Sequence, residues 1–117
     1  MSEPDDPWYP FDGGRTLGGG GSESGIMLCD DEHEFGARIS LERDAKTAPF
    51  AITCGIYDWM VHTRFFRHEE DARRDFAAMK QALDAILRSI PFKTDPDLDA
   101  KMRATTQQIE QFIERFP

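Results

Sequence analysis

The segment Met60–Phe66 contains two side chains that could do chemistry, His62 and Arg64, and Tyr57 lies just before it. Residues two apart on a strand project from the same face, so His62 and Arg64 would point the same way. A histidine titrates near neutral pH and suits acid–base work, whereas an arginine suits anion binding. A catalytic histidine also needs positioned partners, and the sequence shows none. We therefore assign no catalytic residue and favour a hydrogen-bonded sheet histidine.

Thiols and carboxylates supply two further candidate sites. With no secretory signal visible, Cys29 and Cys54 are expected to be reduced thiols. The strand pairing predicted below places Cys54 and His62 on opposite faces, which argues against a thiol nucleophile. The run Asp30–Glu34 offers hard ligands and one imidazole, but its spacing matches neither an EF-hand nor a His-x-x-x-His pair. We predict a charged hairpin loop there, with no metal site and no cofactor.

Strands at about residues 25–31, 36–44, 50–57 and 60–67 must position these groups. Alternation of Ala37, Ile39 and Leu41 with polar residues is typical of a half-buried strand. If Asp58-Trp59 is a two-residue hairpin loop, Ile56 faces Val61. This dipeptide lacks the glycine that such a turn favours, so a longer loop is also possible. A shift of one residue would reverse every side chain of the last strand.

Two helices are expected after the strands, at about residues 69–90 and 96–115. The first has a continuous apolar stripe, made by Ala72, Phe76, Met79, Leu83, Ile86 and Ile90. In the second, apolar residues recur at heptad spacing with Thr105 as the weak member, after Asp95 as N-cap and Pro96 as first helical residue. Packing of this helix on the domain is favoured over pairing with a second copy.

Strands followed by helices predict an α+β fold, a four-stranded antiparallel meander of order β-β-β-β-α-α. The first helix is expected to pack on the sheet face that holds Ile39, Leu41, Ile52, Cys54, Ile56, Val61 and Phe65. The opposite face is more aromatic and less charged than a solvated face would be. We predict that it binds something, through a surface made of Arg38, Thr53, Tyr57, Met60, His62, Arg64 and Phe66.

Residues 1–24 are predicted to be a flexible, acidic arm rich in proline and glycine, ahead of a single domain at 25–117. The arm nevertheless contains Trp8, Tyr9 and Phe11 between prolines, and disordered segments are usually poor in aromatic residues. We hypothesise that these three residues dock in a groove of this chain or of a partner. A tail with chance aromatics is the alternative.

The charge is distributed unevenly. Residues 1–35 carry nine acidic residues and one basic residue, whereas residues 36–117 carry thirteen of each. An acidic front on a neutral body, with no basic stripe, argues against binding to nucleic acid or to anionic membranes. Apolar runs are far shorter than the roughly 18 residues that span a bilayer. Without a secretory signal, a cytoplasmic location is expected.

The stretch Phe50–Phe66, FAITCGIYDWMVHTRFF, followed by a helix, resembles small bacterial proteins in which a sheet precedes a helix, including some immunity proteins that neutralise toxins. The resemblance assigns no functional residue. The leading hypothesis is a protein-interaction module, immunity-type or regulatory and homodimeric. Alternatives are a small-molecule-binding protein or enzyme that uses the face around His62 and Arg64, and a domain whose visible features are all structural.

Overall fold

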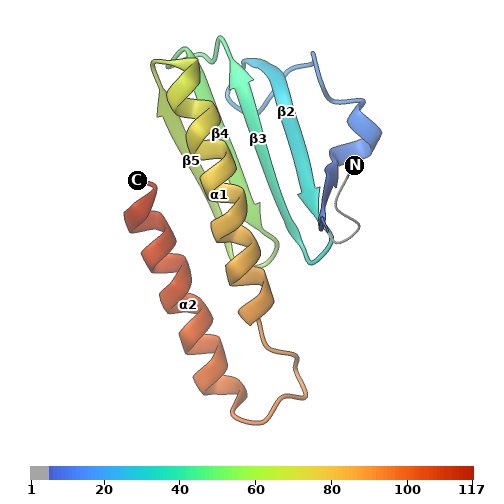
Figure 1. The fold of residues 1–117 in the computed structure, drawn as a ribbon, viewed down its shortest axis with the longest axis vertical. Helices are drawn as coiled ribbons and strands as arrows, with labels where there is room; N and C mark the ends of the chain where they lie inside the picture. The colour runs from blue at the N-terminus through green and yellow to red at the C-terminus, as the bar shows by residue number, and fades with distance from the viewer. Residues whose placement is uncertain (1–5) are drawn as a thin grey trace.

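The computed structural model describes residues 6–117 and confirms the α+β class (Figure 1). A single antiparallel sheet has the strand order β1-β2-β3-β4-β5, and both helices lie on one side of it. The elements are β1 (Trp8–Pro10), a 3-10 turn η1 (Phe11–Gly14), β2 (Ile26–His33), β3 (Ala37–Arg43), β4 (Phe50–Ile56), β5 (Met60–Phe66), α1 (Glu69–Ser89) and α2 (Leu98–Arg115). In residues 6–117, neither helix is long and apolar enough to cross a membrane.

The prediction of four strands is wrong by one, because residues 8–10 form a fifth. β1 pairs with β2 in antiparallel register, with Trp8 opposite His33 and Pro10 opposite Asp31. Proline has no N–H group to donate within a sheet. It is tolerated in β1 because β1 is an edge strand. Three residues next to prolines are too short to show the alternation of a strand. The first five residues of the predicted arm lie outside the described part of the chain, and the flexibility of residues 6–24 stays a prediction.

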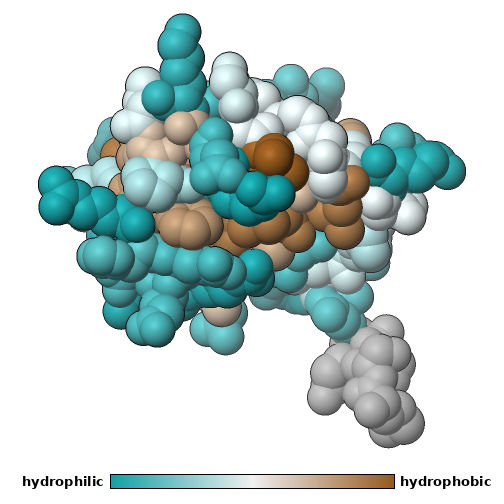
Figure 2. All heavy atoms as spheres, turned by 90° about the horizontal axis from the view of Figure 1, so that it is seen from above, coloured by the Kyte–Doolittle hydropathy of each residue, from teal (hydrophilic) through white to brown (hydrophobic). Residues whose placement is uncertain are grey.

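The predicted apolar stripe of α1 is confirmed except at its end, where Ile90 follows the helix in an extended conformation and is partly buried. Ala72, Phe76, Met79, Leu83 and Ile86 are buried against the sheet face of Ala37, Ile39, Leu41, Ile52, Cys54 and Ile56. Acidic residues occupy the first turn of α1, where the helix dipole favours them. Seen from one end, hydrophobic residues form a band across the middle of the molecule with hydrophilic residues around it (Figure 2). The helix-covered face is therefore the main core.

Helix α2 lies beside α1 and extends beyond one end of the sheet (Figure 1). It begins at Leu98, two residues later than predicted, after Asp97 in a left-handed conformation. Instead of capping the helix, the Asp95 carboxylate accepts the Phe92 N–H at 3.0 Å. The buried residues of α2 belong to the same core as those of α1, and Phe112 is one of them. Packing on the domain therefore accounts for most of the apolar stripe of α2.

The hairpin between β4 and β5 has a three-residue loop rather than the favoured two-residue loop. Ile56 pairs with Met60, and Cys54 pairs with His62. Asp58 takes a φ of 71° at the centre of the loop, and aspartate is one of the few residues besides glycine that tolerate this region. The longer loop shifts β5 by one residue. The predicted placement of Val61 on the helix-covered face is therefore wrong, as is that of Phe65, and His62 lies on that face instead.

Candidate functional site

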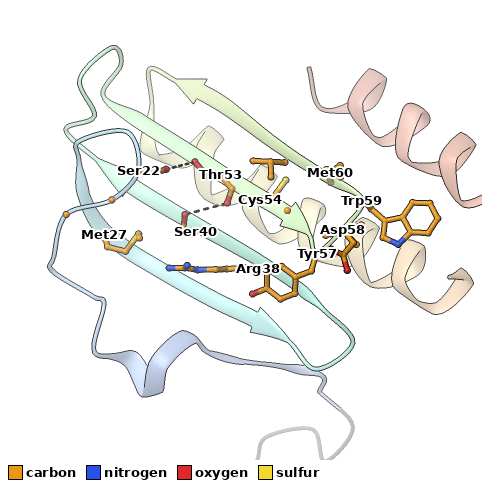
Figure 3. Close-up of a pocket in the computed structure, with 15 residues that line it drawn as sticks. Ser22, Met27, Arg38, Ser40, Thr53, Cys54, Tyr57, Asp58, Trp59 and Met60 are labelled. Carbon is orange, nitrogen blue, oxygen red and sulfur yellow. Dashed lines mark hydrogen bonds between the residues drawn. The ribbon is translucent and has the colours of Figure 1, made fainter. Parts of the chain in front are cut away.

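The face of the sheet turned away from the helices contains a pocket of about 700 Å³ (Figure 3). Strands β3, β4 and β5 form its floor, the segment Gly20–Ser22 forms one wall, and the β4–β5 loop forms another. We call this surface the open face. Side chains or backbone atoms of these residues line the pocket: Gly20, Gly21, Ser22, Met27, Arg38, Ser40, Thr53, Cys54, Gly55, Ile56, Tyr57, Asp58, Trp59, Met60 and Val61.

The glycine-rich wall is fixed to the sheet by the buried carboxylate of Glu42. That carboxylate accepts the backbone N–H of Glu23 at 3.1 Å and of Gly25 at 3.0 Å. Backbone hydrogen bonds in both directions also join Gly18–Gly19 to Met27, each of 2.9 Å. A Cβ atom at Gly21 would overlap the Glu42 carboxyl group, so a larger residue there would force this carboxylate out of its place. The glycine run is thus a wall of the pocket in this structure.

Hydroxyl groups occupy the floor of the pocket. The Ser22 and Thr53 hydroxyls lie 3.3 Å apart, and Ser40 donates to the Thr53 carbonyl at 3.5 Å. Their dashed contacts are visible in Figure 3, which also shows Met27 beside the glycine wall. Hydroxyls can rotate to donate or accept, so they can follow the needs of a ligand. Met27 and Val61 add apolar surface at opposite sides.

Arg38 is the cation of the pocket, and its charge is already neutralised. Its guanidinium donates to both carboxylate oxygens of buried Asp30, at 2.9 and 2.7 Å, and Thr16 donates to the same carboxylate at 2.7 Å. The hydrogen bond to Asp30 raises the pKa of Arg38. The guanidinium carbon also lies 3.5 Å from the centre of the Phe11 ring. This bidentate pair with buried Asp30 leaves little free positive charge for an anionic ligand, although the Arg38 side chain is partly exposed.

Tyr57 lines the pocket from the β4–β5 loop, and its side chain reaches across to β2. Its hydroxyl donates to Glu32 at 2.8 Å, and Tyr9 donates to the other oxygen of the same carboxylate at 3.1 Å. Burial, followed by the hydrogen bond to Glu32, raises the pKa of Tyr57 to about 12. The Tyr57 phenol therefore stays neutral at ordinary pH and donates its proton in the hydrogen bond to Glu32. The phenol oxygen can still accept a hydrogen bond from a ligand.

The predicted seven-residue surface is divided between the two faces. Arg38, Thr53 and Tyr57 lie on the open face with the pocket. The other four residues belong to β5, where the one-residue shift turns their side chains toward the helices; they are Met60, His62, Arg64 and Phe66. Met60 also contributes to the pocket lining close to the turn. A single surface made of all seven residues therefore does not form.

On the helix-covered face, His62 and Arg64 hold the C-terminal end of α2. The Nε2 of His62 donates to the Phe116 carbonyl at 2.6 Å. Arg64 donates to Asp75 of α1 at 2.8 Å and to the Pro117 oxygen at 3.0 Å. Their polar atoms are thus committed to joining β5, α1 and the segment after α2. These contacts give both residues a structural role.

The three aromatic residues of the arm lie on the chain's own sheet. Trp8 makes an edge contact with His33, with ring centres 4.9 Å apart, and its ring lies 5.1 Å from the Lys80 ammonium. Phe11 covers Arg38 and Tyr9 reaches Glu32, as described above. The place of this segment beside β2 explains why aromatic residues stand between the prolines.

The acidic run of β2 projects alternately to the two faces, so its members have separate partners. Asp30 binds Arg38 on the open face, Asp31 pairs with Lys80 at 2.8 Å on the other, and His33 bonds to Asp84 at 2.7 Å. His33 Nδ1 accepts the Phe35 N–H, so Nε2 carries the proton and donates it to Asp84. In the described part of the chain, no three His, Cys, Asp or Glu side chains converge in a way that could hold a metal ion.

Sequence reasoning missed Ser22, Met27 and Val61 as pocket residues. The alternation of β3 already placed Ser40 on the same side as Arg38, so that part of the floor had a visible signal. The glycine wall had none, because its position depends on the contact with distant Glu42. Val61 was assigned to the other face through the hairpin register.

The chain matches no protein-family model, no curated protein and no solved structure. We therefore infer function from the chemistry of the open face.

Proposed function

We propose that the protein is a binding protein that holds a small, uncharged and largely apolar molecule in the pocket of the open face. The observation that carries this proposal is the pocket itself, about 700 Å³ in volume and walled by the glycine segment. Small-molecule sites typically measure about 300–1,000 Å³ and combine apolar walls with a few polar groups. The pocket has both features, which a plain solvated sheet face lacks.

The charges of the pocket support an uncharged ligand. Asp30 neutralises Arg38 through two hydrogen bonds, and Asp58 is exposed in the β4–β5 loop, where water screens it. Burying an ion against this floor would cost desolvation that no free counter-charge offsets. Hydroxyls of Ser40 and Thr53 can instead orient a neutral ligand by single hydrogen bonds.

The reactive side chains favour binding over catalysis. His62 is bonded to Phe116 on the helix-covered face. Burial raises the pKa of the Cys54 thiol to about 12, so the nucleophilic thiolate is scarce at neutral pH. The open face thus presents hydroxyls and apolar groups without an activated nucleophile or a positioned base among the described residues. We assign no reaction.

A titration with Nile red, a flat and uncharged dye that brightens in apolar surroundings, tests the proposal. The wild-type protein is expected to bind the dye with saturable fluorescence. Thr53→Tyr should weaken binding by roughly tenfold or more, because the larger side chain fills the floor while keeping good strand propensity. Thr94→Tyr makes the same exchange at an exposed position between the helices and should bind like wild type.

Two outcomes would reject the pocket as the binding site. One is the absence of saturable binding to wild type, and the other is equal binding by the Thr53 and Thr94 variants. Circular dichroism of both variants shows whether the fold is kept, so that loss of binding is not confused with unfolding.

A second candidate function is the protein-interaction module expected from the sequence. Exposed apolar side chains on the open face favour it, because Val61 is 80% exposed and Phe65 is 49% exposed. Saturable dye binding that ceases when a protein partner is added would support shared use of this face.

A further inference from the structure

Strand β5 forms an open edge of the sheet. Its seven residues pair with β4 in continuous register, without a bulge, and include no proline and no lysine. The one inward-pointing charge of β5, Arg64, is already paired with Asp75. The opposite edge differs: β1 has only three residues, ends in Pro10 and follows Pro7. Unprotected edges are templates for another strand, and natural proteins usually block them unless they are used.

The direction of the free backbone groups of β5 follows from the neighbouring strands. The Tyr57 N–H donates to the Gly36 carbonyl, on the β3 side of the hairpin. Backbone groups alternate along a strand, so those of Gly55 also point toward β3. Its partner Val61 must then point its backbone away from β4. By the same alternation, Val61, Thr63 and Phe65 present their N–H and C=O groups at the free edge.

We propose that β5 pairs in antiparallel register with β5 of a second copy of this chain, about a twofold axis at Thr63. Thr63 then faces Thr63 of the partner subunit, and Val61 faces Phe65 of the partner subunit. These are the residues whose backbone groups point outward, so each pair forms ladder hydrogen bonds. The pairing joins two five-stranded sheets into one continuous sheet.

The edge fits a copy of itself better than an unrelated strand. With the axis at Thr63, the 80% exposed Val61 and the 49% exposed Phe65 cover each other across the interface, and hydroxyl meets hydroxyl. A shift by two residues would place Val61 opposite a threonine instead. Within residues 6–117, β5 is the one edge of the sheet that is long and continuous, so the assembly closes as a dimer and does not continue as a fibre.

The polar groups on the helix-covered side of the interface are already paired within each chain. There His62 would face Arg64 of the partner subunit. Within one chain, Arg64 is already neutralised by Asp75, and His62 is bonded to the Phe116 carbonyl. The hydrogen bonds that link β5 to the end of α2 run through these two side chains, not through the backbone edge.

The second copy would also add to the pocket. Val61 lines the pocket at its β5 side, where the sheet ends. Phe65 of the partner subunit, placed beside Val61, would extend this wall with an aromatic ring. This last step rests on the proposed function, whereas the dimer itself does not, because its evidence is the edge of the sheet.

Light scattering over a range of protein concentrations tests the dimer. Wild type is expected to shift from monomer to dimer mass as concentration rises. Val61→Lys replaces the apolar contact with Phe65 of the partner subunit by a strongly hydrated ammonium at the edge, and should weaken dimerisation by roughly tenfold or more. Ala77→Lys adds the same charge on the exposed side of α1 and should leave the dimer unchanged.

Cross-linking tests the register. In a Cys29→Ser background, Thr63→Cys should be joined to its copy by dibromobimane, which bridges only nearby thiols. Val61→Cys should not, since two copies of residue 61 would lie about 13 Å apart along antiparallel strands. Equal cross-linking of both variants, a strict monomer at high concentration, or an unaffected Val61→Lys dimer would each overturn the proposal. A strict monomer that still binds Nile red would reject the dimer and keep the binding pocket. A dimer that binds no Nile red would keep the dimer and reject the binding pocket.

Discussion

The two faces of the sheet are built from alternate residues of the same strands, yet they differ in almost every property. On the helix-covered face, Ile39, Leu41 and Ile52 are fully buried by α1. On the open face, Arg38, Ser40 and Thr53 surround a pocket that the glycine segment only partly covers. Strand parity alone decides which role a residue has. Substitutions on the first face should therefore act on stability, and those on the second should act mainly on binding.

The largest effect is expected for Leu83→Ala in α1. Leu83 is fully buried against the sheet, and removing such a side chain costs about 2–5 kcal/mol of unfolding free energy through lost transfer energy and the cavity left behind. Urea denaturation measures the change. Val61→Ala on the open face provides the contrast, measured at protein concentrations where the chain is monomeric, with an expected change within about 0.5 kcal/mol because Val61 is mostly exposed there. Similar losses for both variants would contradict the division between the faces.

An intermediate effect is expected for Glu42→Ala, because Glu42 serves the open face from a buried position. The substitution leaves the N–H groups of Glu23 and Gly25 without their acceptor, at a cost of about 1–3 kcal/mol. It should also loosen the glycine wall and weaken Nile red binding. Glu42→Gln keeps one oxygen acceptor and should lose less on both measures, and Glu110→Ala on the exposed surface of α2 should lose nothing. Unchanged stability of Glu42→Ala would show that the wall is not held by this carboxylate.

Sequence patterns predicted the layers but not the site. The stripe of α1 and the alternation of β3 depend on residues close in sequence, and both are present as expected. The composition of the open face depends instead on the loop length between β4 and β5. The loop has three residues, Tyr57 to Trp59, where two were predicted. As a result, Val61 and Phe65 lie on the open face, and His62 and Arg64 lie on the helix-covered face. One indication of the longer loop was present in the sequence, because Asp58-Trp59 lacks the glycine that a two-residue turn favours. This absence allowed a longer loop but did not predict its length.

The N-terminal segment shows a second limit. Its prolines and glycines are typical of a flexible arm, and only its aromatic residues indicated an ordered segment. Their partners come from distant parts of the chain: His33 and Lys80 for Trp8, and Arg38 for Phe11. Contacts of this kind have no local periodicity, so a short strand such as β1 and a wall such as Gly20–Ser22 cannot be derived from spacing alone.

The smallest effect is expected at high pH, through Tyr57. Burial and the hydrogen bond to Glu32 raise its pKa in the folded state to about 12, above the ordinary value of 10.0. Between these two values the folded state holds the proton more firmly than the unfolded state, so stability should fall as pH rises through this range. Because the side chain is about half exposed, the loss should be modest. Denaturation midpoints at several pH values should decline less steeply for Tyr57→Phe, and an equal slope would assign the decline to other groups.

Amide chemical shifts recorded by NMR during a Nile red titration test most directly whether the open face is the binding surface. We predict saturable shifts at Ser22, Ser40, Thr53 and Val61, with the amides of Met79 and Leu83 in α1 unmoved. Shifts concentrated in the helices, or no saturable shift anywhere, would contradict the assignment of binding to the open face.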